Sequence, residues 1–210
     1  MSVADIRREY PGEPFDEAHS DADPFTQFSV WFEQARSTEA DPTAMALATA
    51  TQDGRPSVRT VLLKGVDTRG FVFYTNYRSR KARELDQTGR ASLLFVWRSR
   101  ERQVRVEGSV EKVTDAESDA YFASRPIESR WSVYASRQSE PIESRAALDA
   151  GYETARQKYG DAVPRPSWWG GYRVVPDEFE FWQGRASRLH DRIQYRRQAG
   201  GSWVRERLAP

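Results

Sequence analysis

The sequence contains no cysteine, and this absence excludes disulfide bonds, thiolate catalysis and iron–sulfur ligation. Only two histidines are present, His19 and His190, so a zinc site built from several histidines is not expected. No segment is apolar over the length needed to cross a bilayer, and the first residues lack the apolar run of a signal peptide. We therefore expect a cytoplasmic protein with no metal site and no membrane partner.

An excess of charge of one sign is also missing, because 32 Lys and Arg stand against 31 Asp and Glu, for a net charge of +1. A protein-wide field that would attract nucleic acid is therefore absent, and no nucleic-acid partner is expected. A binding module that uses arginines and aromatic side chains is the alternative that this balance disfavours. The chain is instead rich in aromatics, with seven Trp, nine Tyr and ten Phe, which can bury large surfaces in a core.

The length of 210 residues fits one domain with helical additions. Residues 1–23 are polar, contain Pro11, Gly12 and Pro14, and predict a mobile arm. Residues 24–210 are expected to form a single domain. A helix is predicted to begin at Pro24, because Asp23 is a good cap and proline suits the first turn.

Strands joined by turns of hairpin length are predicted to fill the middle of the chain. This pattern favours an antiparallel sheet or barrel over alternating βαβ units, so the expected class is mostly β with flanking helices (α+β). These strands cover residues 43–51, 57–64, 71–75, 90–97 and 102–113, with a short helix over 79–86.

Helices and then strands are predicted in the last half of the chain. The helices cover residues 115–124, 126–137 and 141–159. In the last helix, the positions expected to be buried are Ala146, Leu148, Tyr152 and Ala155. The final strands are predicted over residues 171–175, 179–183, 188–197 and 203–208.

Residues 179–192, FEFWQGRASRLHDR, pass from an aromatic strand through a turn into a basic segment. If that segment is extended, side chains alternate between faces, and Arg188, His190 and Arg192 point the same way. Two guanidiniums beside an imidazole suit an anionic aromatic ligand. A charged strand edge without a ligand is the alternative, because charge often protects sheet edges from pairing.

Two cations, Arg59 and Lys64, lie on the otherwise apolar strand predicted over residues 57–64. Five positions apart on a regular strand, they face opposite sides of the sheet. A buried cation needs a partner, so a phosphate or carboxylate ligand for each is one interpretation. Side chains that reach solvent at the strand ends are the other.

A second cationic cluster opens the helix predicted over residues 79–86, where Arg80 and Lys81 follow the cap residue Ser79. A helix N-terminus offers free N–H groups, and cations beside it complete a favourable phosphate site. Cations at this end oppose the helix dipole, which favours a bound anion. An ordinary exposed turn is the alternative interpretation.

A third candidate site combines hydroxyls with a cation, because Tyr121, Arg125 and Ser129 recur every four residues and could hold a phosphate monoester. Pro126 is expected to break the helix between them. Neutral side chains that could bind the edges of a heterocycle are Gln103, Gln138 and Ser139. No Gly-rich phosphate loop, Ser-His-Asp order or metal-ligand spacing is present, so a bound cofactor is expected to supply the chemistry.

These motifs, taken in order, resemble those of the pyridoxine 5′-phosphate oxidases over nearly the whole chain. The final motif is the most specific of them. The landmarks are ADPTAM at 40–45, RTVLLK at 59–64, FYTNYRSRKA at 73–82, SLLFVW at 92–97, ERQVRVEG at 101–108, YFASRP at 121–126, RQSEPI at 137–142, PSWWGGYRV at 166–174 and FEFWQGRASRLHDR at 179–192.

The resemblance implies the flavin-binding split β-barrel, a homodimer with two flavin mononucleotide (FMN) sites at its interface. Among the implied FMN contacts, Arg59, Arg80, Lys81 and Ser139 suit the phosphate, and the amides suit the polar atoms of the ring and the ribityl chain. The full set is Arg59, Thr60, Val61, Leu62, Leu63, Lys64, Tyr74, Thr75, Arg80, Lys81, Gln103, Gln138, Ser139, Trp182 and Arg192.

The same resemblance implies a substrate site. The substrate phosphate would be held by Lys64, Tyr121, Arg125 and Ser129. The catalytic pair would be Arg188 and His190, which would cover and orient the pyridine ring, with Arg188 as an electrostatic partner because guanidinium stays protonated. A lid over the substrate would consist of Arg7, Arg8, Glu9 and Tyr10.

The implied reaction oxidises pyridoxine 5′-phosphate or pyridoxamine 5′-phosphate to pyridoxal 5′-phosphate, with O2 reduced to H2O2. A split-barrel protein with a different substrate is the alternative, and the intact phosphate and pyridine contacts argue against it. Two segments depart from the family pattern. Residues 130–134 read RWSVY where the family usually has QIGAW, and the segment after Tyr10 is acidic where relatives often carry arginines.

Overall fold

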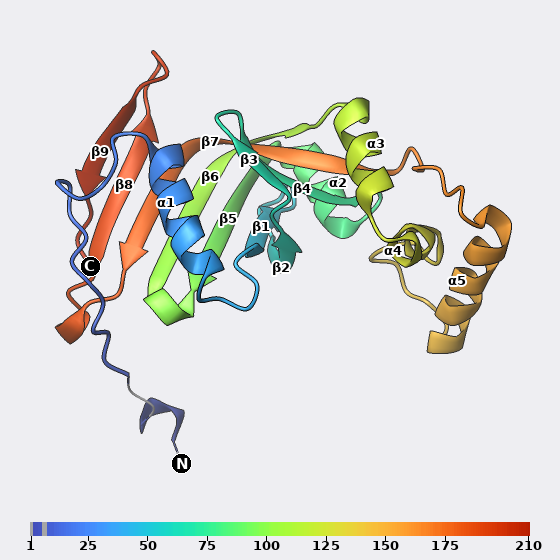
Figure 1. Ribbon diagram of the computed structural model, residues 1–210, viewed down its shortest axis with the longest axis horizontal. Coiled ribbons are helices and arrows are strands. Elements are labelled where there is room, and N and C mark those ends of the chain that lie inside the picture. Colours follow the sequence, from blue (N-terminus) through green and yellow to red (C-terminus); the bar gives the residue numbers. More distant parts are fainter. Residues whose placement is uncertain (1, 6–7) are drawn as a thin grey trace.

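The structure, a computed structural model, describes residues 2–5 and 8–210. Within this part of the chain, nine antiparallel strands form one curled sheet in the order β2-β1-β5-β6-β7-β4-β3, and β8 and β9 extend it from β7 (Figure 1). The strands are β1 (Ala44–Ala50), β2 (Pro56–Leu62), β3 (Gly65–Asp67), β4 (Gly70–Asn76), β5 (Arg90–Trp97), β6 (Arg102–Lys112), β7 (Trp169–Gln183), β8 (Asp191–Arg197) and β9 (Trp203–Arg207).

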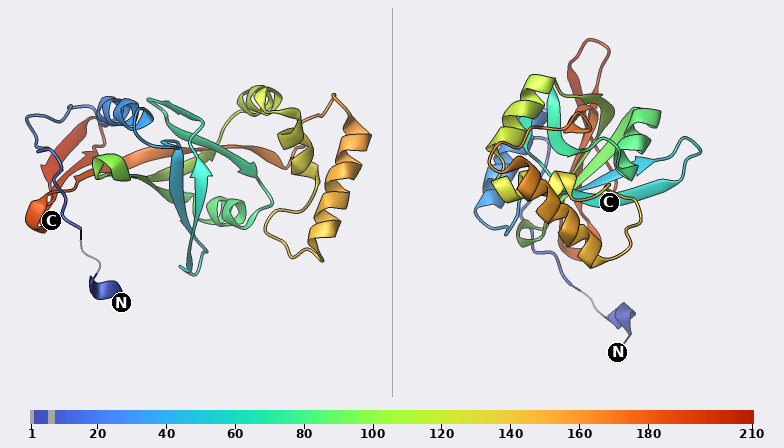
Figure 2. Two further views of the ribbon diagram at one scale, coloured as in Figure 1. Left: turned by 60° about the horizontal axis from the view of Figure 1, so that its bottom comes forward. Right: turned by 90° about the vertical axis from the view of Figure 1, so that its right-hand side faces the viewer.

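Helices flank this sheet, which confirms the predicted class of antiparallel β-structure with flanking helices. Figure 2 shows α4 and α5 at one end of an elongated molecule and the β8–β9 ribbon at the other. The helices are α1 (Pro24–Arg36), α2 (Arg80–Thr88), α3 (Asp115–Ser124), α4 (Ile127–Trp131) and α5 (Arg145–Tyr159), with short 3₁₀ turns at Val3–Asp5, Arg98–Arg100, Ser132–Tyr134 and Ala186–Arg188. No helix in the described ranges is both long and apolar enough to span a bilayer.

The core lies between α1 and the concave face of the sheet. The predicted cap is confirmed, because the Asp23 carboxylate accepts a hydrogen bond from the Thr26 amide at 2.9 Å. From this helix Phe28 and Trp31 pack edge-on against sheet aromatics, with ring centroids 4.8 Å from Phe71 and 5.3 Å from Phe181 respectively. Most of the buried aromatics therefore fill this main core, and a second, smaller cluster forms around Phe122 and Trp169.

Strand alternation sends a second set of side chains to the opposite face. In β6 the buried residues Val104 and Val106 alternate with Gln103 and Arg105, which are only partly buried. Strand pairing places Gln103 opposite Val96 of β5 and Trp182 of β7, and it places Trp182 opposite Arg192 of β8. Directly opposed residues in an antiparallel sheet share a face. Val96, Gln103, Trp182 and Arg192 therefore form one row across four strands.

The strand β7 is continuous, so the prediction of separate strands over 171–175 and 179–183 is wrong. Pro176 cannot donate a ladder hydrogen bond. The register between β6 and β7 shifts at this point, where Gly108 faces Pro176. A Cβ on Gly108 would lie 2.0 Å from the carbonyl oxygen of Val175, so only glycine lets the strands stay paired through the bulge.

Two predicted helices begin or end differently in the structure. The helix predicted over 141–159 starts at Arg145, because the Ser144 side chain caps it by accepting from the Ala147 amide. Of its predicted buried positions, Ala155 is buried, Leu148 and Tyr152 are partly buried, and Ala146 is exposed, which is a correction. The helix predicted over 126–137 is the short α4 followed by a 3₁₀ turn that ends at Tyr134.

The strand predicted over 188–197 begins only at Asp191. Before it, Ser187 and Arg188 have φ angles of 55° and 61°, in the left-handed region that few side chains favour. Arg188 therefore does not alternate along a strand with His190 and Arg192, and the prediction that strand alternation aligns these three residues is wrong.

The second half of the predicted arm makes contacts with the domain. Phe15 is 5% exposed and packs on Trp31 with ring centroids 4.7 Å apart. The Tyr195 hydroxyl donates to the carbonyl of Asp21 at 2.6 Å. Mobility of residues 1–23 stays a prediction, and Arg7 lies outside the described residues.

Candidate functional site

Two pockets contain most of the predicted site residues, and they have no lining residue in common. We call the first the cation pocket, a cavity of about 340 Å³. Four of its lining residues are cations, and no Asp or Glu lines it. Cations gathered without a carboxylate repel one another, so the pocket favours an anionic ligand. It is lined by Arg59, Thr60, Val61, Leu62, Lys64, Tyr74, Thr75, Lys81, Tyr121, Arg125, Gln138 and Trp169.

Arg59 and Lys64 reach the cation pocket from β2 and the residues that follow it. The Arg59 guanidinium donates to the carbonyl of Leu47 on β1 at 3.0 Å and to the hydroxyl of Thr49. β2 ends at Leu62, so Lys64 lies beyond the regular strand. The prediction that Arg59 and Lys64 face opposite sides is therefore wrong, because the alternation stops before Lys64 and both line one pocket.

The start of α2 supplies another cation. The predicted cap is confirmed, since the Ser79 hydroxyl accepts from the Ala82 amide at 3.4 Å. Lys81 Nζ donates to Gln138 Oε1 at 3.0 Å and to the Thr75 hydroxyl at 3.2 Å. Burial, followed by the charge of Arg59, lowers the pKa of Lys81. The ammonium group of Lys81 on α2 therefore joins side chains from β4 and from the segment that contains Gln138.

An aromatic stack supports the other side of the cation pocket. Tyr74 and Tyr121 stack with ring centroids 3.9 Å apart, and Trp169 lies parallel to both. The Arg125 guanidinium lies 4.8 Å from the centre of the Trp169 ring, and its buried NH1 has no hydrogen-bond partner. Burial lowers the pKa of Arg125. A buried cationic donor without a partner fits a phosphate or carboxylate ligand.

Trp169 is a residue of this pocket for which no site role was expected, although it lies in the landmark PSWWGGYRV. It is 6% exposed, and the pairing of β4 with β7 places it opposite Asn76, close to Tyr74. Its position depends on pairing between strands almost a hundred residues apart, which periodicity cannot reveal. Ser129, by contrast, lies on α4 beyond the break at Pro126 and does not line the pocket, so its substrate contact stays a prediction.

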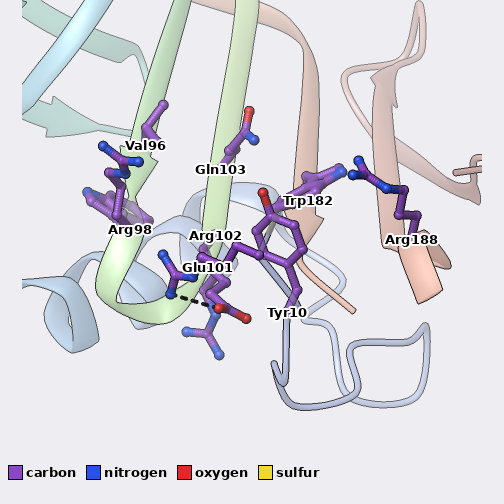
Figure 3. A pocket seen from close by; sticks show the side chains of 10 residues that line it. Tyr10, Val96, Arg98, Glu101, Arg102, Gln103, Trp182 and Arg188 are labelled. Atoms are coloured by element: carbon purple, nitrogen blue, oxygen red, sulfur yellow. Dashed lines mark hydrogen bonds and ion pairs between the residues drawn. The ribbon is translucent and has the colours of Figure 1, made fainter. Parts of the chain in front are cut away.

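The second pocket, which we call the arm pocket, is a cavity of about 370 Å³. Figure 3 shows Tyr10 beside Trp182, with Gln103 on the neighbouring strand and Arg188 extending towards Trp182 from the other side. The Tyr10 ring stands edge-on to Trp182 with centroids 6.0 Å apart. The pocket is lined by Arg8, Tyr10, Val96, Trp97, Arg98, Glu101, Arg102, Gln103, Trp182 and Arg188.

The arm crosses this pocket through specific contacts. Arg8 pairs with Glu101 at 2.9 Å, and the Glu101 side chain is only 7% exposed. Arg185 NH1 donates to the Gly12 carbonyl at 3.2 Å, while Glu9 is exposed and does not line the pocket. Of the predicted lid residues that the structure describes, Arg8 and Tyr10 therefore lie at the site.

His190 lies against the arm pocket, with its ring centroid 4.5 Å from Trp182 and 5.5 Å from Tyr10. Its Nδ1 accepts a hydrogen bond from the Arg185 amide at 3.1 Å, which assigns the proton of the neutral ring to Nε2. Burial, and then the charge of Arg188, lowers its pKa. His190 therefore offers an N–H donor at neutral pH.

Arg102 is a buried cation of the arm pocket that lies in the landmark ERQVRVEG, although no role was expected for it. Its guanidinium lies 4.4 Å from the centre of the Trp31 ring, and Nε donates to Gln183 Oε1 at 2.7 Å. Burial, followed by the charge of Arg100, lowers the pKa of Arg102 to about 10. It holds the strand end beside Gln103, and its partners come from α1 and β7, so no local spacing could reveal it.

Four other predicted residues lie outside both pockets. Arg192 belongs to the row with Trp182, and its Nε donates to Glu180 at 2.7 Å. Arg80 donates to Glu84 at 2.8 Å. Ser139 is exposed and has a φ of 70°. The Leu63 side chain is buried in the core, so only the Leu63 backbone could reach a ligand.

The curled antiparallel sheet, with cationic and aromatic pockets on its outer surfaces, defines the class of split-barrel proteins. The model of the family described as "Pyridoxamine 5'-phosphate oxidase" matches residues 32–159. A second, described as "Pyridoxine 5'-phosphate oxidase C-terminal dimerisation region", matches residues 169–210. The chain belongs to the pyridoxamine 5′-phosphate oxidase family, an oxidoreductase family, which confirms the resemblance predicted from its motifs.

Curated relatives match over the full length. The pyridoxine/pyridoxamine 5′-phosphate oxidase of Bordetella petrii is 54% identical over 211 residues and covers 100% of both chains. That of Ralstonia pickettii is 55% identical over 210 residues, covering 100% of this chain and 99% of the relative.

Solved structures confirm the fold. PhzG from Burkholderia lata, in complex with tetrahydrophenazine-1-carboxylic acid, superposes with a TM-score of 0.89 at 36% identity, over 95% of this chain and 99% of that one. A pyridoxamine 5′-phosphate oxidase-related, FMN binding protein from Nostoc punctiforme superposes with a TM-score of 0.73 over 90% and 100%, and at 19% identity it supports the fold alone.

Proposed function

We propose that the protein is a homodimeric, FMN-dependent oxidase that converts pyridoxine 5′-phosphate and pyridoxamine 5′-phosphate to pyridoxal 5′-phosphate, with O2 reduced to H2O2. The observation that carries the proposal is the cation pocket, where Arg59, Lys64, Lys81 and Arg125 meet and none of the described lining residues is an Asp or Glu. Two phosphate monoesters, one on the cofactor and one on the substrate, account for so many cations in one cavity.

The residues of the cation pocket divide between these two phosphates. Arg59 and Lys81 lie with Thr75 and Gln138 near the start of α2, where a helix N-terminus adds favourable N–H groups. They would hold the FMN phosphate together with Arg80. Lys64 and Arg125, with Tyr121, would hold the substrate phosphate, where the unpartnered Arg125 NH1 gains its acceptor.

The arm pocket would supply the other wall of the same site from the second protomer. The two pockets share no lining residue, yet the resemblance assigns contacts to FMN and substrate in both. The match of residues 169–210 to a dimerisation region supports a second copy as the partner. Apolar side chains are exposed on β2 and β5, where Val58 is 68%, Leu62 39% and Val96 47% exposed. These would be covered in the homodimer.

Bound within that site, FMN would supply the acceptor for a hydride from the exocyclic carbon of the substrate, with O2 as the final oxidant; for the amine substrate, water supplies the aldehyde oxygen and ammonia is released. The protein positions the reactants, which is where most of the rate would come from. Trp182 and Gln103 would border the flavin ring, and Arg188 would place positive charge over the pyridine. His190, neutral at pH 7, would donate from Nε2 to a substrate oxygen or nitrogen.

The arm would close over the bound substrate, with Arg8 and Tyr10 as its contacts and residues 24–210 as the domain that it covers. Besides a second copy of the chain, the partners are small molecules only, and the reaction takes place in the cytoplasm.

Oxygen uptake tests the proposal directly. Purified protein is expected to be yellow, to consume O2 and to form H2O2 with pyridoxine 5′-phosphate or pyridoxamine 5′-phosphate, but not with unphosphorylated pyridoxine at the same concentration. A colourless protein that cannot be reconstituted with FMN contradicts the proposal.

A second candidate is oxidation of a reduced phenazine precursor, favoured by the likeness to PhzG. Lys64 and Arg125, the two cations left for the substrate, and the unpartnered Arg125 NH1 suit a phosphate of nearly two negative charges better than a carboxylate of one, so the phosphorylated substrates are the better fit. Faster O2 uptake with tetrahydrophenazine-1-carboxylic acid than with either phosphorylated substrate would reverse this choice.

A further inference from the structure

A buried carboxylate on α2 has no part in the sites described above. The Glu84 side chain is 3% exposed and accepts hydrogen bonds from the hydroxyls of Thr49 and Ser57. It also accepts from Arg80 Nε at 2.8 Å and pairs with an NH2 of Arg59 at 3.3 Å. One carboxylate therefore holds two guanidiniums, each of which is a proposed contact of the FMN phosphate.

The contacts of the two arginines show which N–H groups remain for a ligand. Arg80 uses its Nε on Glu84, and its side chain is 55% exposed, so its two terminal nitrogens are free to point outwards. Arg59 is fixed more firmly, with further bonds to the Leu47 carbonyl and the Ser57 hydroxyl, and it lines the cation pocket. Glu84 binds both from the buried side, away from solvent.

Glu84 stays ionised in this position. Burial alone would raise its pKa, but the hydrogen bonds from Ser57, Thr49 and Arg80 hold the pKa at about 2. A long side chain such as Arg80 loses much conformational freedom when a ligand orders it. A carboxylate that orders it beforehand reduces this cost of binding.

We propose that Glu84 is a positioning residue that sets Arg59 and Arg80 for the flavin phosphate and so determines the preference for phosphorylated over unphosphorylated flavin. This inference rests on the proposed function, because it takes FMN as the cofactor. The competing explanation is a purely structural ion cluster that joins α2 to β1 and β2. That cluster would affect the binding of every flavin equally.

The negative charge of Glu84 is expected to weaken phosphate binding, whereas its positioning of the two arginines is expected to strengthen it. The variants are chosen to separate these two effects. The Glu84 carboxylate repels a bound phosphate, while its contacts hold the arginines in place. Glu84→Asp keeps the charge and shortens the reach by one methylene, so it removes positioning alone. Glu84→Gln keeps the reach and an acceptor oxygen but removes the charge, so it is the conservative variant that should retain function.

The experiment measures dissociation constants of the full-length apoprotein for FMN and for riboflavin by quenching of flavin fluorescence. For Glu84→Asp, FMN binding is expected to weaken roughly tenfold while riboflavin binding changes less than about twofold. Glu84→Gln is expected to bind FMN more tightly than Glu84→Asp does. The matched control is Asp86→Asn on the same helix, where the carboxylate contacts Lys112 and Tyr172, and its ratio of FMN to riboflavin affinity should equal that of wild type.

Three results would overturn the inference. These are an unchanged FMN affinity in Glu84→Asp, an equal loss for both flavins, or weaker FMN binding in Glu84→Gln than in Glu84→Asp. A wild-type protein that binds neither flavin contradicts the proposed function instead. If Glu84→Asp is not recovered folded, Ser57→Ala takes its place, because it removes a hydroxyl that holds the same carboxylate. The same selective but smaller loss is then required.

Discussion

In the cation pocket, the cations stand on β2, just beyond it, on α2 or at the end of α3, and they contact neighbours such as the Leu47 carbonyl, Gln138 and the Trp169 ring. The arm pocket combines strand residues with Arg8 and Tyr10, which come from a segment without regular secondary structure, and with Arg188, which ends a 3₁₀ turn. One pocket is thus organised before a ligand arrives, and the other contains parts that can adjust. We expect substitutions in the first to change binding and substitutions in the second to change turnover.

The largest effect is expected for Arg188→Ala. Loss of one positioned cationic donor at a reacting centre typically lowers kcat by roughly 100-fold or more. FMN should remain bound, because its phosphate is assigned to the cation pocket, which Arg188 does not line. Steady-state oxygen uptake measures the effect, with Arg196→Ala on β8 as the control, since Arg196 pairs only with Glu206. Turnover equal to wild type would remove Arg188 from the site.

Arg125→Ala is expected to raise KM for pyridoxine 5′-phosphate by roughly 10- to 100-fold, because a charged hydrogen bond contributes about 1.5–3 kcal/mol. The value of kcat should change much less. Arg145→Ala on α5 is the control, since its side chain is 82% exposed and pairs with Asp149. A large loss of kcat with KM unchanged would contradict the division of roles between the pockets.

Mixing these two variants tests whether each site combines pockets of two protomers. In co-expressed Arg188→Ala and Arg125→Ala chains, half of random dimers are mixed, and each mixed dimer holds one intact site. Activity at low substrate should therefore recover to roughly a quarter of wild type, which is about 25-fold above the Arg188→Ala parent and roughly 2.5- to 25-fold above the Arg125→Ala parent. No recovery in purified mixed dimers would mean that one chain supplies both pockets to its own site.

The smallest effect is expected from pH. The pKa of His190 is lowered from 6.5, so the neutral ring dominates at pH 7 and is lost only as pH falls through the lowered value. Protonation puts a hydrogen on Nδ1 and breaks the bond from the Arg185 amide. We expect kcat/KM to be flat above pH 6.5 and to fall severalfold on the acid side.

The substrate phosphate also titrates near pH 6, so the His190 effect needs its own control. The pH profile of His190→Gln should keep the fall in kcat/KM that comes from protonation of the phosphate and lose the fall that comes from protonation of the imidazole. An identical profile for wild type and variant would exclude His190 as the titrating group.

The sequence predicted those features of the fold that depend on neighbouring residues. The cap of α1 at Asp23 and the alternation of β6 follow from local chemistry, and both are confirmed. The left-handed conformation of Ser187 and Arg188 could not be predicted, because neither residue favours it and only the surrounding structure imposes it.

Motifs likewise indicated many residues of the site, but not how they divide between two pockets. That division follows from which strands pair, and β4 meets β7 a hundred residues later in the chain. The same reason hides Trp169 and Glu84, whose partners lie on other elements. Contacts between distant elements produce no repeating pattern in a single sequence, so the sequence alone could not reveal them.

The row formed by Val96, Gln103, Trp182 and Arg192 sets a distance as well as a direction. Neighbouring strands lie about 4.8 Å apart, so four of them spread these side chains over about 14 Å. The spacing of the paired strands therefore fixes how far apart the ligand contacts on this row lie. A one-residue insertion in the turn between β5 and β6 would shift that register and carry Gln103 to the core face. The length of the hairpin is therefore as much a part of the site as its side chains.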